Sequence, residues 1–173
     1  LEINPENPQP KPKVGPEYSG VALGSDGEPV CVDSSMNMTS ADVKKKLLEL
    51  MPLIKERLHF LTDAAEMVRF MFTEPAVPAK SEIIPKKLDE AKTKEVLEKA
   101  KSFVSEIFGM SHDDAEALAK KYAEELGIKL GDFMMPVRMA VTGSRISPPL
   151  IGSIWILGKE KACERVEKTL AAF

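Results

Sequence analysis

The feature that most constrains the fold is a series of amphipathic helical patterns that begins near Thr39 and continues to the C-terminus. In LDEAKTKEVLEKAKSFVSEIF, apolar residues recur at helical spacing, at Val96, Leu97, Ala100, Phe103, Val104 and Ile107. The segment SHDDAEALAKKYAEELG adds a Ser111 cap, an acidic first turn and Gly127 as a stop. Strand-like alternation is scarce, so the sequence predicts an all-α fold.

Shorter helical patterns lie on both sides of these two. SADVKKKLLELM begins with a Ser or Thr cap. Because proline is badly tolerated inside a helix, we expect Pro52 to sit in the first turn of a second helix, PLIKERLHF. TDAAEMVRFMF predicts a third helix, which a proline-rich connector follows. LGDFMMPVRMAVTG, SPPLIGSIWIL and GKEKACERVEKTLAAF predict three short helices near the C-terminus, each bounded by Gly or Pro.

Residues 1–40 have a different texture. They hold six of the 13 prolines and four of the ten glycines, which predicts an extended or flexible Pro/Gly-rich segment. Within it, GVALGSDGEPVCVD could form a weak hairpin, because Gly-Ser-Asp-Gly is turn chemistry between two apolar runs. The first residue is Leu1, so we expect the chain to be a fragment of a longer protein.

Composition excludes some classes of protein and leaves others open. No apolar run approaches the roughly 20 residues of a membrane helix, and LEINPENPQPKPKV lacks the apolar core of a signal peptide. A cytoplasmic location without membrane attachment is therefore expected. The net charge is −3, of which residues 1–40 carry −4 and the remainder +1. A nearly neutral body leaves room for a local basic patch.

No catalytic or metal-binding pattern is present. The two cysteines, Cys31 and Cys163, lie far apart, and the two histidines form no cluster. The glycines form neither a phosphate loop nor a dinucleotide fingerprint. Asp113 and Asp114 fit a helix cap better than a metal site. We expect no catalytic residue, metal or cofactor in this chain.

Single arginines near the predicted element ends leave two interpretations open. Arg57 follows PLIKE, and Arg138 lies in the apolar helix before the Thr-Gly-Ser-Arg turn. Lone arginines more often lie in ordinary surface ion pairs. A guanidinium beside the Ser147-Pro148-Pro149 corner is also suited to bidentate contact with a base edge or a phosphate. Unstacked RNA bases are recognised by this mixture of apolar and hydrogen-bonding groups.

The C-terminal segment PVRMAVTGSRISPPLIGSIWILGKEKACERVEKTL resembles the signature of bacterial-type glutamyl-tRNA synthetases. A Pro-x-Arg-x-Ala-x-Thr-Gly helix leads to a Ser-Pro-x-Leu corner, then to Leu-Gly-Lys-Glu and a final helix containing Arg165. LLELMPLIKERLHFLTDAAEMVRFMF and LGIKLGDFMMPVR resemble segments of the same enzymes. The resemblance covers about residues 41–173 and implies the α-helical anticodon-binding region of a class I aminoacyl-tRNA synthetase.

That resemblance implies two small helical subdomains, residues 41–110 with a connector and residues 111–173. It also implies the residues that contact the tRNA anticodon. The arginine that matches Arg138 acts with the corner to hold the wobble base, and the one that matches Arg57 reads the third anticodon base. The implied anticodon-binding set is Arg57, Arg138, Ser147, Pro148 and Leu150.

The resemblance further implies that the protein is a monomer and that it binds glutamate tRNA. Whether it also binds glutamine tRNA stays open. The family's His-x-Gly-His motif and its Lys-x-Ser-Lys-type loop are absent from this sequence. Catalysis, with ATP and Mg²⁺, is therefore expected only of a full-length glutamate–tRNA ligase. Two alternatives stay open: a helical protein-interaction module derived from such a synthetase, and a plain structural helical bundle.

Overall fold

The structure is a computed structural model that describes residues 21–23, 29–31, 38–55, 57–58 and 61–173. Eight helices account for most of these residues, and the all-α prediction is confirmed. They are α1 Ser40–Ile54, α2 Leu61–Phe72, α3 Lys80–Ile83, α4 Glu90–Glu106, α5 His112–Glu125, α6 Leu130–Thr142, α7 Leu150–Leu157 and α8 Lys159–Ala171.

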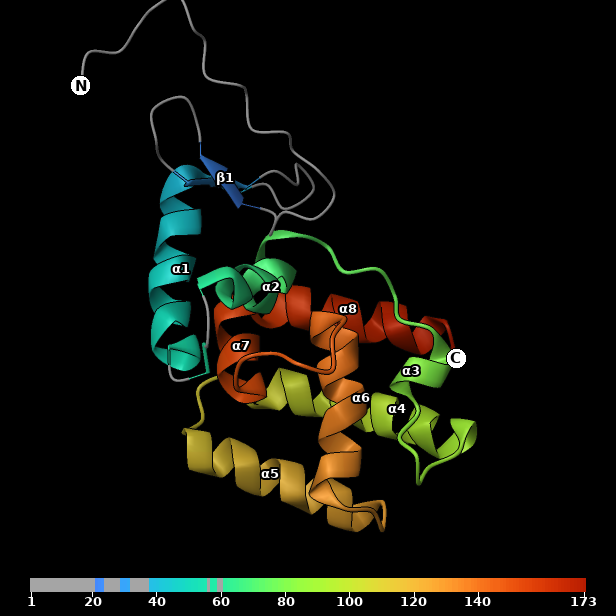
Figure 1. Cartoon of the computed structure of the whole chain (residues 1–173). Helices are drawn as coiled ribbons and strands as arrows, with labels where there is room; N and C mark the ends of the chain where they lie inside the picture. Colours follow the sequence, from blue (N-terminus) through green and yellow to red (C-terminus); the bar gives the residue numbers. More distant parts are fainter. Residues whose placement is uncertain (1–20, 24–28, 32–37, 56, 59–60) are drawn as a thin grey trace, which may run out of the picture.

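Two three-residue strands precede the helices. β1 Val21–Leu23 pairs antiparallel with β2 Pro29–Cys31, with Val21 opposite Cys31. This is the weak hairpin that the turn residues suggested, and β2 lies beside α1 (Figure 1). The remainder of the predicted Pro/Gly-rich segment 1–40 lies largely outside the described residues.

The prediction that Pro52 begins a new helix is wrong. α1 continues through Pro52 to Ile54. In the described part of PLIKERLHF beyond it, Lys55 and Arg57 lie in a turn and Leu58 has no regular secondary structure. Pro52 lies on the exposed side of α1, where water can replace the backbone hydrogen bond that proline removes. Leu50 and Ile54, both buried, hold the last turn against the core. Packing therefore outweighs the cost of proline at this position.

Other helix ends follow the sequence signals. The Thr39 hydroxyl accepts a hydrogen bond from the Asp42 amide at 3.3 Å, and the Asp42 carboxylate accepts one from the Thr39 amide at 3.0 Å. This is a capping box at the start of α1. The Ser111 hydroxyl accepts in the same way from the Asp114 amide at the start of α5. The acidic pair Asp113 and Asp114 thus lies in a first helical turn, as predicted.

One apolar core connects the helices. α4 lies along α8 and also contacts α5 and α6 (Figure 1). Phe103 of α4 packs edge-to-face against Tyr122 of α5 and Phe133 of α6, with ring centroids 6.4 and 5.7 Å apart. Leu50 of α1 and Val166 of α8 belong to the same buried cluster. The core is thus shared by helices on both sides of residue 110, and the position of the boundary between two subdomains stays a prediction.

A matched pair of glycines tests how tightly the chain packs at the end of α6. Gly143 has φ of 68°, and a Cβ added there would lie 2.7 Å from the Cβ of Pro75. Gly127, after α5, has φ of 67°, but an added Cβ would meet nothing within 4 Å. We expect Gly127→Ala to lower the free energy of unfolding by about 1–2 kcal/mol, the cost of a left-handed backbone. Gly143→Ala should cost roughly 1 kcal/mol more, because Pro75 must move.

Urea denaturation followed by far-UV circular dichroism measures both costs. Equal losses of stability in the two variants would contradict the close approach of Pro75 to Gly143.

Candidate nucleic-acid interface

The segment between α6 and α7, residues 143–149, forms a tight reversal that includes Ser147-Pro148-Pro149. We call this whole segment the corner. It begins at Gly143, which caps the C-terminus of α6. Its φ of 68° lies in the left-handed region, which glycine adopts readily. The Thr142 hydroxyl donates to the Arg138 carbonyl at 2.9 Å and accepts from the Ser144 amide at 3.3 Å. The corner is therefore tied to the last turn of α6.

Arg138 holds the far end of the corner. Its half-buried Nη1 donates to the carbonyl oxygens of Ser147 at 3.4 Å and Pro148 at 3.2 Å, and to the Ser147 hydroxyl. Ser147 is only 3% exposed, and its hydroxyl donates to the Pro148 carbonyl. Leu150 is also buried and belongs to the apolar core beneath the corner. The corner is thus a rigid surface feature with a packed base.

Arg57 reaches the same place from the turn after α1. It is exposed, and its Nη1 donates to the Ser147 carbonyl at 3.5 Å. Arg57 and Ser147 are 90 residues apart in the sequence. The structure therefore brings together Arg57, Arg138, Ser147 and Pro148, while the Leu150 side chain lies in the core.

The two guanidinium groups share a carbonyl oxygen rather than a carboxylate. Within the described part of the chain, neither Arg57 nor Arg138 forms an ion pair, and each uses only Nη1 for its hydrogen bonds. Burial and then the neighbouring Arg57 charge lower the pKa of Arg138. An arginine lowered in this way still stays charged at neutral pH. The remaining N–H groups are left to meet an anionic or polar ligand.

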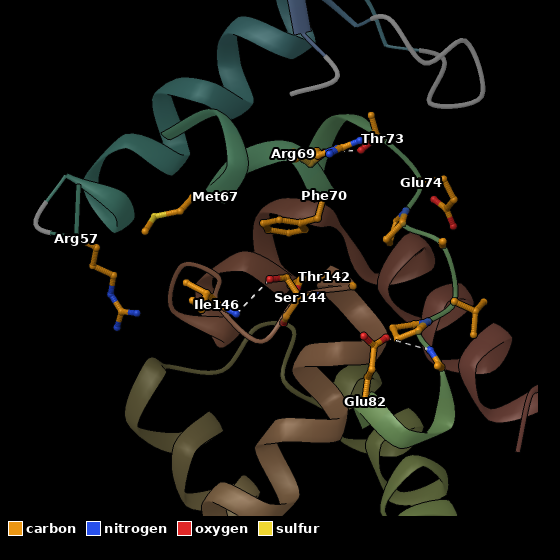
Figure 2. A pocket seen from close by; sticks show the side chains of 16 residues that line it. Arg57, Met67, Arg69, Phe70, Thr73, Glu74, Glu82, Thr142, Ser144 and Ile146 are labelled. Carbon is orange, nitrogen blue, oxygen red and sulfur yellow. Dashed lines mark hydrogen bonds between the residues drawn. The ribbon is translucent and has the colours of Figure 1, made fainter. Parts of the chain in front are cut away.

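A groove of about 770 Å³ lies next to the corner. Its walls are the end of α2, the segment 73–79 and the first residues of the corner, with Arg57 at one end (Figure 2). Ile146 and Val77, which line it, are 75% and 45% exposed. The groove thus offers apolar surface together with the arginine, as an unstacked base requires.

Sequence reasoning gave no role to the buried Arg165 of α8. Its guanidinium donates to the carbonyls of Val141 and Thr73 and forms an ion pair with Glu74 at 3.3 Å. The available signal was its position: Arg165 shares the apolar stripe of its helix with Ala162, Val166 and Thr169. An arginine on such a stripe predicts a buried partner.

Two observations concern metal binding and thiol reactivity among the described residues. These residues contain no group of three or more His, Cys, Asp and Glu side chains that could hold a metal ion. Burial raises the pKa of the Cys163 thiol, which disfavours the reactive thiolate. A search of the same residues finds no helix with the length and apolar character to cross a membrane.

Comparisons with known proteins give the same picture. A glutamate–tRNA ligase of Treponema denticola is 58% identical over 74% of this chain, and the matched part is 25% of that protein. One of Roseiflexus is 38% identical over 76% of the chain and 26% of its own length. The chain thus spans about a quarter of the curated relatives that it matches.

Solved structures share the fold. A glutamate tRNA ligase of Elizabethkingia meningosepticum, solved in complex with its amino acid, superposes with a TM-score of 0.60 at 22% identity. The superposition covers 73% of this chain and 25% of that one.

The family model for the anticodon binding domain matches residues 29–170. This match and the relatives confirm the resemblance to glutamyl-tRNA synthetases seen in the C-terminal signature. The chain is a member of the anticodon-binding-domain family, and the relatives described above are glutamate–tRNA ligases.

Proposed function

We propose that this chain binds the anticodon of glutamate tRNA and is the anticodon-reading part of a glutamate–tRNA ligase. The observation that carries the proposal is the convergence of Arg57 and Arg138 on the Ser147 carbonyl, with no carboxylate partner for either among the described residues. Two cations without a carboxylate partner among the described residues, beside a groove of mixed apolar and polar side chains, suit a single-stranded nucleic acid, which supplies phosphates and unstacked bases.

Roles for the individual residues are those that the resemblance to glutamyl-tRNA synthetases implies. Arg138 would hold the wobble base: the carbonyls of Ser147 and Pro148 fix its guanidinium, and its remaining N–H groups are left for a ligand. Arg57, exposed on a separate segment, would read the third anticodon base and thereby discriminate against glutamine tRNA. Leu150 supports the corner from the core instead of touching RNA. Rigid placement favours specificity, because little side-chain entropy is lost on binding.

The full-length protein, by the same proposal, attaches glutamate to tRNA during protein biosynthesis in the cytoplasm and is monomeric. ATP and Mg²⁺ would be used by the catalytic part of such a ligase. This chain would contribute binding energy and specificity, and no bond-making step is assigned to it.

One observation favours the alternative of a protein-interaction module. Leu48 and Met51 on α1 are 66% and 45% exposed, and they form an apolar strip beside Pro52. Amphipathic partners bind such strips. Capture of a protein partner through α1, without any affinity for tRNA, would favour this alternative over anticodon binding.

The direct test is titration of the chain with glutamate tRNA and with a version altered in the anticodon, at several salt concentrations. We expect the unaltered tRNA to bind more tightly at each salt concentration, because base contacts differ while phosphate contacts are shared. Equal binding of the two RNAs throughout would mean that the chain does not read the anticodon.

Substitution of Arg138 tests its role. Arg138→Ala should weaken binding of glutamate tRNA by about 1–3 kcal/mol, the range for a base-edge contact. Lys120→Ala is a suitable control, because Lys120 pairs with Glu116 on the exposed face of α5. Fluorescence anisotropy gives both dissociation constants, and an unchanged affinity in Arg138→Ala would remove that residue from the site.

Arg57 is tested through selectivity. Arg57→Ala should narrow the affinity ratio between glutamate tRNA and glutamine tRNA, since the guanidinium is expected to favour the former at the third base. Lys55→Ala is the control, because it removes an exposed charge from the same turn after α1. The proposal for Arg57 is wrong if the two variants change the ratio equally.

A further inference from the structure

A buried arginine joins three segments around the groove. Arg165 of α8 is 2% exposed. Its Nη1 donates to the Val141 carbonyl at 2.8 Å, in the last turn of α6, and its Nη2 donates to the Thr73 carbonyl at 3.3 Å, just after α2. The planar fork of a guanidinium suits two acceptors on different segments, whereas a lysine ammonium is a point charge.

Glu74 supplies the opposite charge. Its carboxylate lies 3.3 Å from Nη2 of Arg165, 3.1 Å from Nζ of Lys168 and 3.4 Å from Nζ of Lys161. Burial alone would raise the pKa of Glu74, but the Lys168 hydrogen bond and the charges of Arg165, Lys161 and Lys168 lower it overall. The carboxylate is therefore ionised at neutral pH and compensates the buried guanidinium.

The ion pair joins two of the walls of the groove. The connector (residues 73–79) forms one of them and includes Glu74, and another is formed by Thr142, Gly143, Ser144 and Ile146. Arg165 donates to Thr73 of the first wall and to Val141, which precedes Thr142 of the second. Pro75 lies so close to Gly143 that an added Cβ there would be 2.7 Å from the proline Cβ. Arg165 thus ties the connector to α6 beside the point where the connector touches the corner.

We propose that Glu74 and Arg165, together called the clasp, are positioning residues that hold the connector and the corner at the spacing that receives the anticodon loop. This inference rests on the proposed function and deepens it. The clasp side chains act through the walls that they hold, and contact with the RNA is assigned to the corner.

The clasp differs from the exposed ion pairs of the chain because its arginine is buried. Exposed pairs contribute little to stability or position. Loss of one partner of a buried pair leaves the other charge uncompensated, and the surroundings then rearrange. A wall that is held in place before binding loses less freedom when the RNA arrives, so both affinity and discrimination depend on it.

Glu74→Gln tests the clasp, because it removes the counter-charge and keeps the size of the side chain. The matched control is Glu167→Gln, which removes an exposed ion pair on the helix of Arg165, Lys101–Glu167 at 2.7 Å, without touching the groove. Hydrogen exchange should become faster in the non-proline amides of 73–79 in Glu74→Gln. The control should exchange like the unsubstituted chain.

The second readout is the ratio of dissociation constants for the altered and unaltered glutamate tRNA. We expect Glu74→Gln to reduce this ratio by about three- to tenfold, and Glu167→Gln to leave it unchanged. If Glu74→Gln fails to fold, Lys168→Gln weakens the clasp more gently and should shift both readouts in the same direction.

The outcomes separate this inference from the proposed function. A chain without substitutions that does not distinguish the two RNAs contradicts the proposed function. A Glu74→Gln variant that distinguishes them as well as the unsubstituted chain, with unchanged exchange in the connector, overturns the clasp and leaves the proposed function standing. Faster hydrogen exchange in the connector, together with an unchanged ratio of dissociation constants for the two RNAs, also overturns the inference. The clasp would then be merely structural.

Discussion

The hydrogen bonds from the Arg138 guanidinium to the carbonyls of Ser147 and Pro148 hold the surface on which the proposed function depends. They bring the end of the corner back against α6, and they fix the Ser147 carbonyl where Arg57 also reaches it. Without them the end of the corner at Pro148 and Pro149 would lack these bonds to α6. With them the corner presents two guanidinium groups beside a groove of mixed apolar and polar side chains.

Positive charge at the corner is arranged differently from positive charge in the ion pairs of the described residues. Lys99 and Glu125, or Lys101 and Glu167, neutralise each other on the surface. Even the buried Arg165 has a carboxylate partner in Glu74. Concentrating positive charge without such a partner costs stability, because like charges repel. A polyanionic ligand would recover that cost on binding, and under the proposed function this is how a nearly neutral body binds RNA.

The helices were predictable because local signals and burial agree along most of the chain. The apolar stripe that ends at Ile107, the Ser111 cap and the glycine after α6 each specify an element from a few neighbouring residues. Two places differ from the prediction. The short helix α3, Lys80–Ile83, lies in the expected proline-rich connector. At Pro52, tertiary packing at Leu50 and Ile54 carries α1 through a residue that local rules treat as a helix start. Local preference is weak enough for packing to override it.

The candidate site was predictable only where sequence neighbours make it. Arg138 and Ser147 belong to one continuous segment whose signature identified them, although their contact with Arg57 depends on how α1 and α7 pack. The Glu74–Arg165 pair joins residues 91 positions apart, and no local pattern links them. Long-range pairs of this kind depend on how the whole core packs. The sequence therefore suggested the residues proposed to contact the anticodon, but it did not suggest the ion pair proposed to position them.

The central claim, that Arg138 reads the wobble base from the corner, is tested most directly by a double-mutant cycle. The dissociation constants of the unsubstituted chain and of Arg138→Ala are measured with glutamate tRNA and with a tRNA substituted only at the wobble position. A direct contact predicts that the two changes are not additive, with a coupling energy of roughly 0.5–3 kcal/mol. Strict additivity of the two losses would contradict the claim.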